Sequence, residues 1–174
     1  MPIWIRAAVF IAILPAAIAG WIPWVIDRPH SGAPAVHDAG VALVAVGWGI
    51  LLWCALDFGR HGKGTPAPYD PPRALVTSGL YEFVRNPMYV GVLTAVLGWA
   101  LWFWSGWVAF YFVFMALAFH ARVLLYEEPA LARSFGGEFA RYRESVPRWI
   151  PRRLPRRKKL SRDVELGARR STPG

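Results

Sequence analysis

The chain alternates between long apolar blocks and polar segments. Four blocks hold at most one Asp, Glu, Lys or Arg each: Ile3–Ile26, Ala39–Leu56, Met88–Trp104 and Trp107–Leu125. The second block has 18 residues, which as a helix reach about 27 Å at 1.5 Å per residue. That length is close to the thickness of a bilayer core. The pattern predicts an all-α integral membrane protein with about four transmembrane helices.

The first block has a rival interpretation as a secretory signal peptide, with Ala17-Ile18-Ala19 before a cleavage site at Gly20. Arg6 is the only charged residue near the start of this block, and apolar residues continue past the possible cleavage site to Ile26. A signal peptide has a more basic start and a shorter apolar region. We therefore favour a first transmembrane helix.

The composition agrees with a membrane domain. Hydrophobic residues make up 55% of the 174 residues, and ten residues are Trp, which is high for a soluble domain of this size. Cys54 is the only cysteine, so no internal disulfide is possible. We expect one membrane domain, residues 1–151, followed by a basic cytoplasmic tail, residues 152–174.

The distribution of charge predicts the orientation. The net charge is +9, and thirteen of the 20 Lys and Arg residues follow Glu128. The positive-inside rule then places both termini, the loop 57–85 and the tail on the cytoplasmic side. We expect the tail to lie on anionic lipid. Nucleic-acid binding is not expected of a membrane-embedded chain.

The loop 57–85 is the first candidate functional segment. It is rich in Gly and Pro, and a loop of this length is long for a simple connection. At its end, Asn86 and Pro87 read as the N-cap and first residue of a helix. Arg85 precedes them, so a positive charge adjoins the positive end of the helix dipole and suits an anionic group. The alternative is a membrane helix end at which basic residues merely face head groups.

Two acids form the second candidate. Glu127 and Glu128 follow the fourth apolar block, and acids at the C-terminal end of a helix oppose its dipole. We expect a cationic partner, either a cofactor or Arg122. The alternatives are that the acids are the first solvated residues after the membrane and that Arg122 extends to the surface. His30 and His37 lack further ligands nearby, so no metal site is predicted.

Five short motifs carry a family resemblance. They are G-x-G-T-P-x-P at Gly62–Pro68, L-V-x-x-G-x-Y at Leu75–Tyr81, R-N-P-x-Y at Arg85–Tyr89, E-E at Glu127–Glu128 and F-G-x-x-F-x-x-Y at Phe135–Tyr142. Over about residues 60–151 the chain resembles the isoprenylcysteine carboxyl methyltransferase and phospholipid methyltransferase superfamily, membrane enzymes that use S-adenosylmethionine. It departs at Asn86, where many members have His, and at Phe139, where many have Tyr.

The resemblance implies a cofactor site for S-adenosylmethionine. Together with Arg85, which the helix start suggests, the residues expected to bind the cofactor are Arg73, Leu75, Val76, Tyr81, Asn86, Pro87, Met88, Tyr89 and Glu127. Arg122 lies near the position of a substrate-facing Arg in the family, and Glu128 is our candidate general base, so these two are the predicted catalytic residues. Phe135–Tyr142 and Val146–Arg148 resemble a segment that closes over the site.

The predicted function is methyl transfer from S-adenosylmethionine to a lipophilic or small acceptor at a membrane. Three acceptors stay open: a prenylcysteine carboxylate, a phospholipid amine and a thiol. The alternative is a non-catalytic membrane scaffold or transporter subunit. Such a protein would need neither an ordered polar loop nor paired acids after an apolar helix.

Overall fold

The structure, a computed structural model, describes residues 15–27, 34–61 and 75–151. These residues form helices and their connections, so the all-α expectation is confirmed for them. The elements are η1 (Ala17–Trp21), α2 (Ile22–Ile26), α3 (Pro34–His61), η2 (Gly79–Glu82), α4 (Pro87–Phe103), α5 (Gly106–Arg122), η3 (Val123–Glu127) and α6 (Glu128–Ser145). Arg73, the motif Gly62–Pro68 and the tail 152–174 lie outside the described residues.

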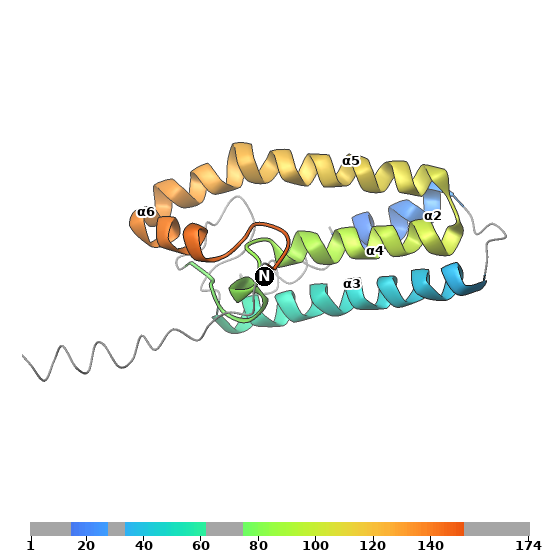
Figure 1. The fold of residues 1–174 in the computed structure, drawn as a ribbon, viewed down its shortest axis with the longest axis horizontal. Coiled ribbons are helices and arrows are strands. Elements are labelled where there is room, and N and C mark those ends of the chain that lie inside the picture. Colours follow the sequence, from blue (N-terminus) through green and yellow to red (C-terminus); the bar gives the residue numbers. More distant parts are fainter. Residues whose placement is uncertain (1–14, 28–33, 62–74, 152–174) are drawn as a thin grey trace, which may run out of the picture.

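Three long helices form the body of the molecule (Figure 1). Helices α3, α4 and α5 lie side by side and run in alternating directions, with α4 in the middle. Helix α3 extends beyond the predicted block 39–56 at both ends. It begins at Pro34, a residue that is favourable in the first turn of a helix.

Two helical runs are long and apolar enough to cross a membrane. They are Pro34–Asp57 and the apolar part of Gly106–Ser145, whereas Ala17–Ile26 and Pro87–Phe103 are shorter apolar helices. Only 22% and 17% of the two most apolar windows is buried within the protein. The exposed residues include Trp107, Phe114 and Leu125. Exposed apolar surface of this extent fits contact with lipid, because soluble proteins rarely leave it uncovered.

Glycines bring α3 and α4 into backbone contact. A Cβ on Gly40 would lie 2.8 Å from the carbonyl oxygen of Gly98, and one on Gly47 would lie 2.7 Å from that of Gly91. Both distances are too short for a real side chain. Small residues allow helices to approach in this way in a membrane. Gly91, Ala95 and Gly98 are the small residues of α4 that face α3.

Proline explains the irregular start of the described chain. Pro23 has no N–H, so it leaves helical carbonyls without a donor, and the preceding turn widens into the π-helix η1. The Nε1–H of Trp99 donates to the carbonyl of Ala19 at 2.6 Å, and the hydroxyl of Tyr111 donates to that of Ile18 at 3.2 Å. Neighbouring helices thus satisfy the carbonyls, as a bilayer requires.

The turn between α4 and α5 marks the end of the bundle away from the candidate site. The hydroxyl of Ser105 accepts a hydrogen bond from the backbone N–H of Val108 at 3.3 Å and donates one to the carboxylate of Asp27. Ser105 therefore caps α5 and joins the N-terminal helices to the α4–α5 hairpin.

At its other end α5 does not stop where the sequence predicted. The chain passes through the π-helix η3 directly into α6, and the N–H of Glu128 donates to the carbonyl of Val123, five residues back. Pro129, which lacks an N–H, cannot continue a regular α-helix through this turn. The prediction that Glu127 and Glu128 end a helix is therefore wrong. The dipole argument does not apply to them.

Helix α6 then bends back toward α4. Gly136 has φ 48° and ψ −120°, which interrupts the helix. A glycine adopts a positive φ without the steric cost that other residues incur. After α6, the segment Val146–Pro151 crosses to the start of α4 (Figure 1).

Candidate active site

The candidate site forms where the C-terminal segment meets the start of α4. The backbone N–H of Arg85 donates to the carbonyl of Pro147 at 2.9 Å. The side-chain amide of Asn86 donates to the carbonyl of Arg148 at 3.2 Å. Two hydrogen bonds therefore hold this C-terminal segment against the R-N-P motif, about 60 residues earlier in the chain.

Asn86 occupies the N-cap position of α4, and Pro87 follows it in the first turn, as predicted. The side chain of Asn86 makes no capping hydrogen bond, however, so that part of the prediction is wrong. Its backbone has φ −127° and ψ 54°, whereas a capping residue usually has an extended ψ. The amide instead reaches the C-terminal segment.

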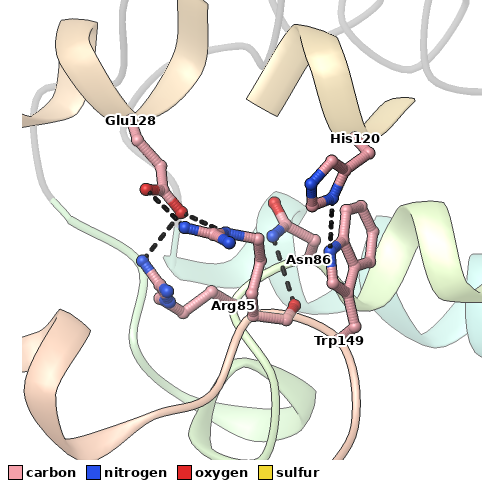
Figure 2. Close-up of polar contacts among 6 residues, drawn as sticks. Arg85, Asn86, His120, Glu128 and Trp149 are labelled. Carbon is pink, nitrogen blue, oxygen red and sulfur yellow. Dashed lines mark hydrogen bonds and ion pairs between the residues drawn. The ribbon is translucent and has the colours of Figure 1, made fainter. Parts of the chain in front are cut away.

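Glu128 lies between two guanidinium groups (Figure 2). Nη1 of Arg85 is 2.9 Å from Oε1 of Glu128. Arg148 binds both carboxylate oxygens, with Nε 2.7 Å from Oε1 and Nη2 3.0 Å from Oε2. Burial by itself would raise the pKa of the Glu128 carboxyl. The hydrogen bonds from Arg148 and the charge of Arg85 outweigh burial and lower that pKa.

Arg85 is the most buried charged group of this cluster. Its side chain is 9% exposed, compared with 12% for Glu128 and 28% for Arg148. Burial lowers the pKa of its guanidinium. Its Nε is buried and has no hydrogen-bond partner among the described residues. Two guanidinium groups share one carboxylate here, so the cluster carries a net positive charge.

A second polar cluster lies one turn further along α4. The hydroxyl of Tyr89 donates to Oε1 of Glu127. The Nε–H of Arg122 donates to the same oxygen at 2.8 Å and to the hydroxyl of Tyr89 at 3.0 Å. The cationic partner expected for one of the two acids is therefore present: it is Arg122, which η3 places on the same face as Glu127.

Aromatic rings cover the second cluster. The ring of Tyr89 stacks on Phe119, with 4.5 Å between the ring centroids. Trp149 lies 6.5 Å from Tyr89 by the same measure, and its Nε1–H donates to Nδ1 of His120 at 3.2 Å. Figure 2 shows His120 and Trp149 facing one another beside Asn86.

The other predicted residues that the structure describes lie before η2, in η2 and at the start of α4. The carbonyl of Tyr81 accepts a hydrogen bond from the hydroxyl of Tyr142 at 2.8 Å, and burial raises the pKa of the Tyr81 side chain. Pro87 is buried, and Met88 packs against the apolar core. Leu75 and Val76 are half-buried in the segment before η2, and Arg73 is not among the described residues.

Sequence reasoning did not include Arg148 and Trp149 among the site residues. It associated Val146–Arg148 with a closing segment only because of the family resemblance. The local signal was V-P-R-W-I-P, in which two prolines restrict the backbone around an Arg and a Trp. The turn at Pro129 and the bend at Gly136 determine which carboxylate Arg148 binds, and neither could be read from this local signal.

The arrangement offers both signs of charge within one small region. The Arg85 cluster suits an anionic group, and the partly exposed carboxylate of Glu127 suits a cation or a hydroxyl donor. Among residues 15–27, 34–61 and 75–151, no group of three or more His, Cys, Asp or Glu residues is placed to hold a metal ion.

Comparisons with known proteins point to one family. The sequence model described as "Phospholipid methyltransferase" matches residues 36–138. Protein-S-isoprenylcysteine O-methyltransferase A of Arabidopsis thaliana is 32% identical over 117 residues, which are 67% of this chain and 59% of that protein. The Schizosaccharomyces pombe protein-S-isoprenylcysteine O-methyltransferase is 34% identical over 77 residues, 44% of this chain and 33% of that protein.

A third relative has a different name. The cobalt-zinc-cadmium resistance protein CzcN of Cupriavidus metallidurans is 36% identical over 116 residues, 65% of this chain and 46% of that protein. This chain therefore spans between 33% and 59% of the length of these relatives. No solved structure shows significant similarity to it.

Proposed function

The chain belongs to the phospholipid methyltransferase family, and on that premise we propose that it is an integral membrane methyltransferase. It moves a methyl group from S-adenosylmethionine to a lipophilic or small acceptor. The observation that carries this proposal is the meeting of three separated motifs in one polar site: R-N-P-x-Y, E-E and the C-terminal V-P-R-W. The ion pair between Arg85 and Glu128 and the pair between Arg122 and Glu127 support it.

The residues present fit the cofactor. S-adenosylmethionine carries a carboxylate, and the buried Nε of Arg85, which has no described partner, lies in a cluster of net positive charge at the start of α4. Glu127 suits the ammonium group or the ribose hydroxyls. The ring faces of Tyr81 and Tyr89 suit the adenine or the sulfonium. Arg73, Leu75, Val76, Asn86, Pro87 and Met88 are assigned by the family resemblance.

The bound cofactor supplies an electrophilic methyl group, and the chain has to orient the acceptor and exclude water. Arg122 is the residue we assign to the acceptor. Its hydrogen bonds to Tyr89 and Glu127 both come from Nε, and its side chain is exposed at the end of α5. A guanidinium in that position suits an acceptor with an anionic group.

We also propose that the protein has four membrane helices, with both termini and the site on the cytoplasmic side. The charge asymmetry of the loops supports this orientation. The two motif-bearing segments then lie on one face of the membrane, where a water-soluble cofactor and a membrane-embedded acceptor can meet.

The main competing hypothesis is a non-catalytic membrane scaffold or transporter subunit. It gives no reason for buried Arg85 to lie beside Glu128 and Arg148, since burying charges is costly. The relative named as a metal resistance protein raises no second candidate, because no specific contact in the described site favours one.

Calorimetry in detergent tests the proposal. We expect purified protein to bind S-adenosylmethionine, and Arg85→Ala and Glu127→Ala each to weaken binding by at least about 1.5 kcal/mol, the scale of a charged hydrogen bond. Arg133→Ala is the control, since Arg133 is exposed on α6. Wild-type affinity in both site variants would contradict the assignments. Transfer of labelled methyl to a panel of carboxylate, amine and thiol acceptors then identifies the acceptor.

A further inference from the structure

We infer that Arg148 is a positioning residue, which keeps Arg85 able to bind an anion by holding the carboxylate of Glu128. This inference rests on the proposed function, because it takes the cofactor carboxylate as the anion at Arg85. It adds to that function a residue to which neither the motifs nor the resemblance gives a role in binding.

The contacts show that Arg148 and Arg85 compete for one acid. Arg148 engages both oxygens of Glu128, at 2.7 and 3.0 Å, whereas Arg85 engages Oε1 alone, at 2.9 Å. A two-point contact of this kind is the stronger and more directional arrangement. The carboxylate is therefore held mainly by Arg148, and Arg85 keeps donors that Glu128 does not use.

Net charge makes this arrangement important. With Arg148 present, the cluster has two cations and one anion. Without Arg148, Glu128 would pair with Arg85 alone and neutralise it. Interactions between charges are strong where side chains are shielded from water, and Arg85 and Glu128 are only 9% and 12% exposed. An incoming carboxylate would then meet a neutral Arg85–Glu128 pair in place of a cluster with a net positive charge.

Arg148 itself is poorly placed to be the anion ligand. Its side chain is 28% exposed, and its Nε and Nη2 are committed to the two oxygens of Glu128. The buried side-chain nitrogen that has no hydrogen-bond partner within the described part of the chain belongs to Arg85. The role of Arg148 is therefore exerted through Glu128, on a neighbouring cation.

Four variants of the full chain separate a charge effect from a shape effect. Arg148→Gln removes the charge but leaves the backbone carbonyl that Asn86 binds. Arg148→Lys keeps the charge without the planar fork. Arg148→Gln combined with Glu128→Gln leaves Arg85 without its acid partner and restores the net charge of +1, and Arg133→Gln on the exposed side of α6 is the matched control. The affinity of each for S-adenosylmethionine and for its decarboxylated analogue is measured by calorimetry in detergent.

We expect Arg148→Gln to weaken binding of S-adenosylmethionine by about tenfold or more, the scale of one charged hydrogen bond. The double variant should recover most of the affinity, Arg148→Lys should retain most of it, and Arg133→Gln should match the wild type. The decarboxylated analogue should bind the wild type and Arg148→Gln about equally.

Three outcomes would overturn the inference. Arg148→Gln could bind like the wild type, the double variant could stay as weak as Arg148→Gln, or the analogue could lose as much affinity as the cofactor. The last two would mean that Arg148 only holds the C-terminal segment in place. A wild-type protein that binds neither ligand would instead refute the proposed function, and with it this inference.

Discussion

At the scale of single residues, Asn86 shows how far a motif determines a role. The R-N-P-x-Y motif correctly predicted a helix start, because an N-cap followed by Pro depends on local backbone chemistry. It did not predict that the amide would bind the carbonyl of Arg148, 62 residues later. Such a contact depends on the path of the intervening chain. Local rules therefore identified the position of Asn86, and tertiary structure set its partner.

This partner leads to a prediction for Asn86. A histidine can donate the same hydrogen bond to the carbonyl of Arg148, whereas an alanine cannot. We expect Asn86→His to keep substantial activity and Asn86→Ala to lose about 1 kcal/mol of stability, the net value of one hydrogen bond, together with cofactor affinity. Thermal unfolding and calorimetry measure the two effects. If Asn86→Ala behaves as the wild type in both, the hydrogen bond has no role.

For Glu128 the sequence and the structure suggest different roles. The sequence suggested a general base, and the structure shows a carboxylate bound by two arginines with a lowered pKa. Such a carboxylate stays ionised to lower pH than an ordinary one, but it accepts a proton less readily. Its role as a base stays a prediction.

Glu128→Gln tests that role. If Glu128 is a base, turnover with an amine or thiol acceptor should fall by roughly 100-fold, cofactor affinity should change little, and a carboxylate acceptor should be unaffected. Because the pKa is lowered, protonation of Glu128 should reduce turnover only below the usual carboxyl range. Equal turnover by variant and wild type with all acceptors would leave Glu128 with the pairing role alone.

At the scale of elements, the structure confirms the helices with strong apolar patterns and corrects the connections between them. Helix α4 matches its predicted block closely. The end of α5 does not, because Pro129 was compatible both with a helix end and with a π turn inside a continuing helix. Tertiary packing decides between these two outcomes, and composition does not.

The contact between α3 and α4 gives a prediction at this scale. Gly47→Ala should destabilise the protein by roughly 1–3 kcal/mol, the cost of overpacking, because the added Cβ would lie 2.5 Å from the backbone nitrogen of Ala95. Gly49→Ala is the matched control on the same helix, since a Cβ there meets nothing within 4 Å. Thermal unfolding in detergent should separate the two variants. Similar melting temperatures would contradict the close contact.

At the scale of the whole molecule, apolar patterning predicted the helices, and short motifs contain most of the charged residues that the structure brings together in the candidate site. The pairing of those charges depended on the bend at Gly136 and on the return of residues 146–151, neither of which has a periodic pattern. The number of membrane crossings stays a prediction, because two of the four apolar helices are short in the described chain.

The orientation can be tested directly. Tags placed at the two termini of the full-length protein should both be accessible only from the cytoplasmic side, because the basic loops are retained there. A tag in the segment Asp27–Asp38 should be accessible only from the opposite side. A C-terminal tag that is accessible from outside would contradict the proposed arrangement.

The return of the C-terminal segment to α4 also has a consequence for biosynthesis. Arg85 leaves the ribosome more than 60 residues before Trp149. Helices α4 and α5 can therefore enter the membrane before the C-terminal segment that completes the site has been made. During that interval the start of α4 has no Pro147 or Arg148 carbonyl to bind, and Glu128 has no second arginine. A nascent chain arrested at Ser145 would therefore contain all the described helices yet lack a complete site, which forms only after the segment that follows α6 has left the ribosome.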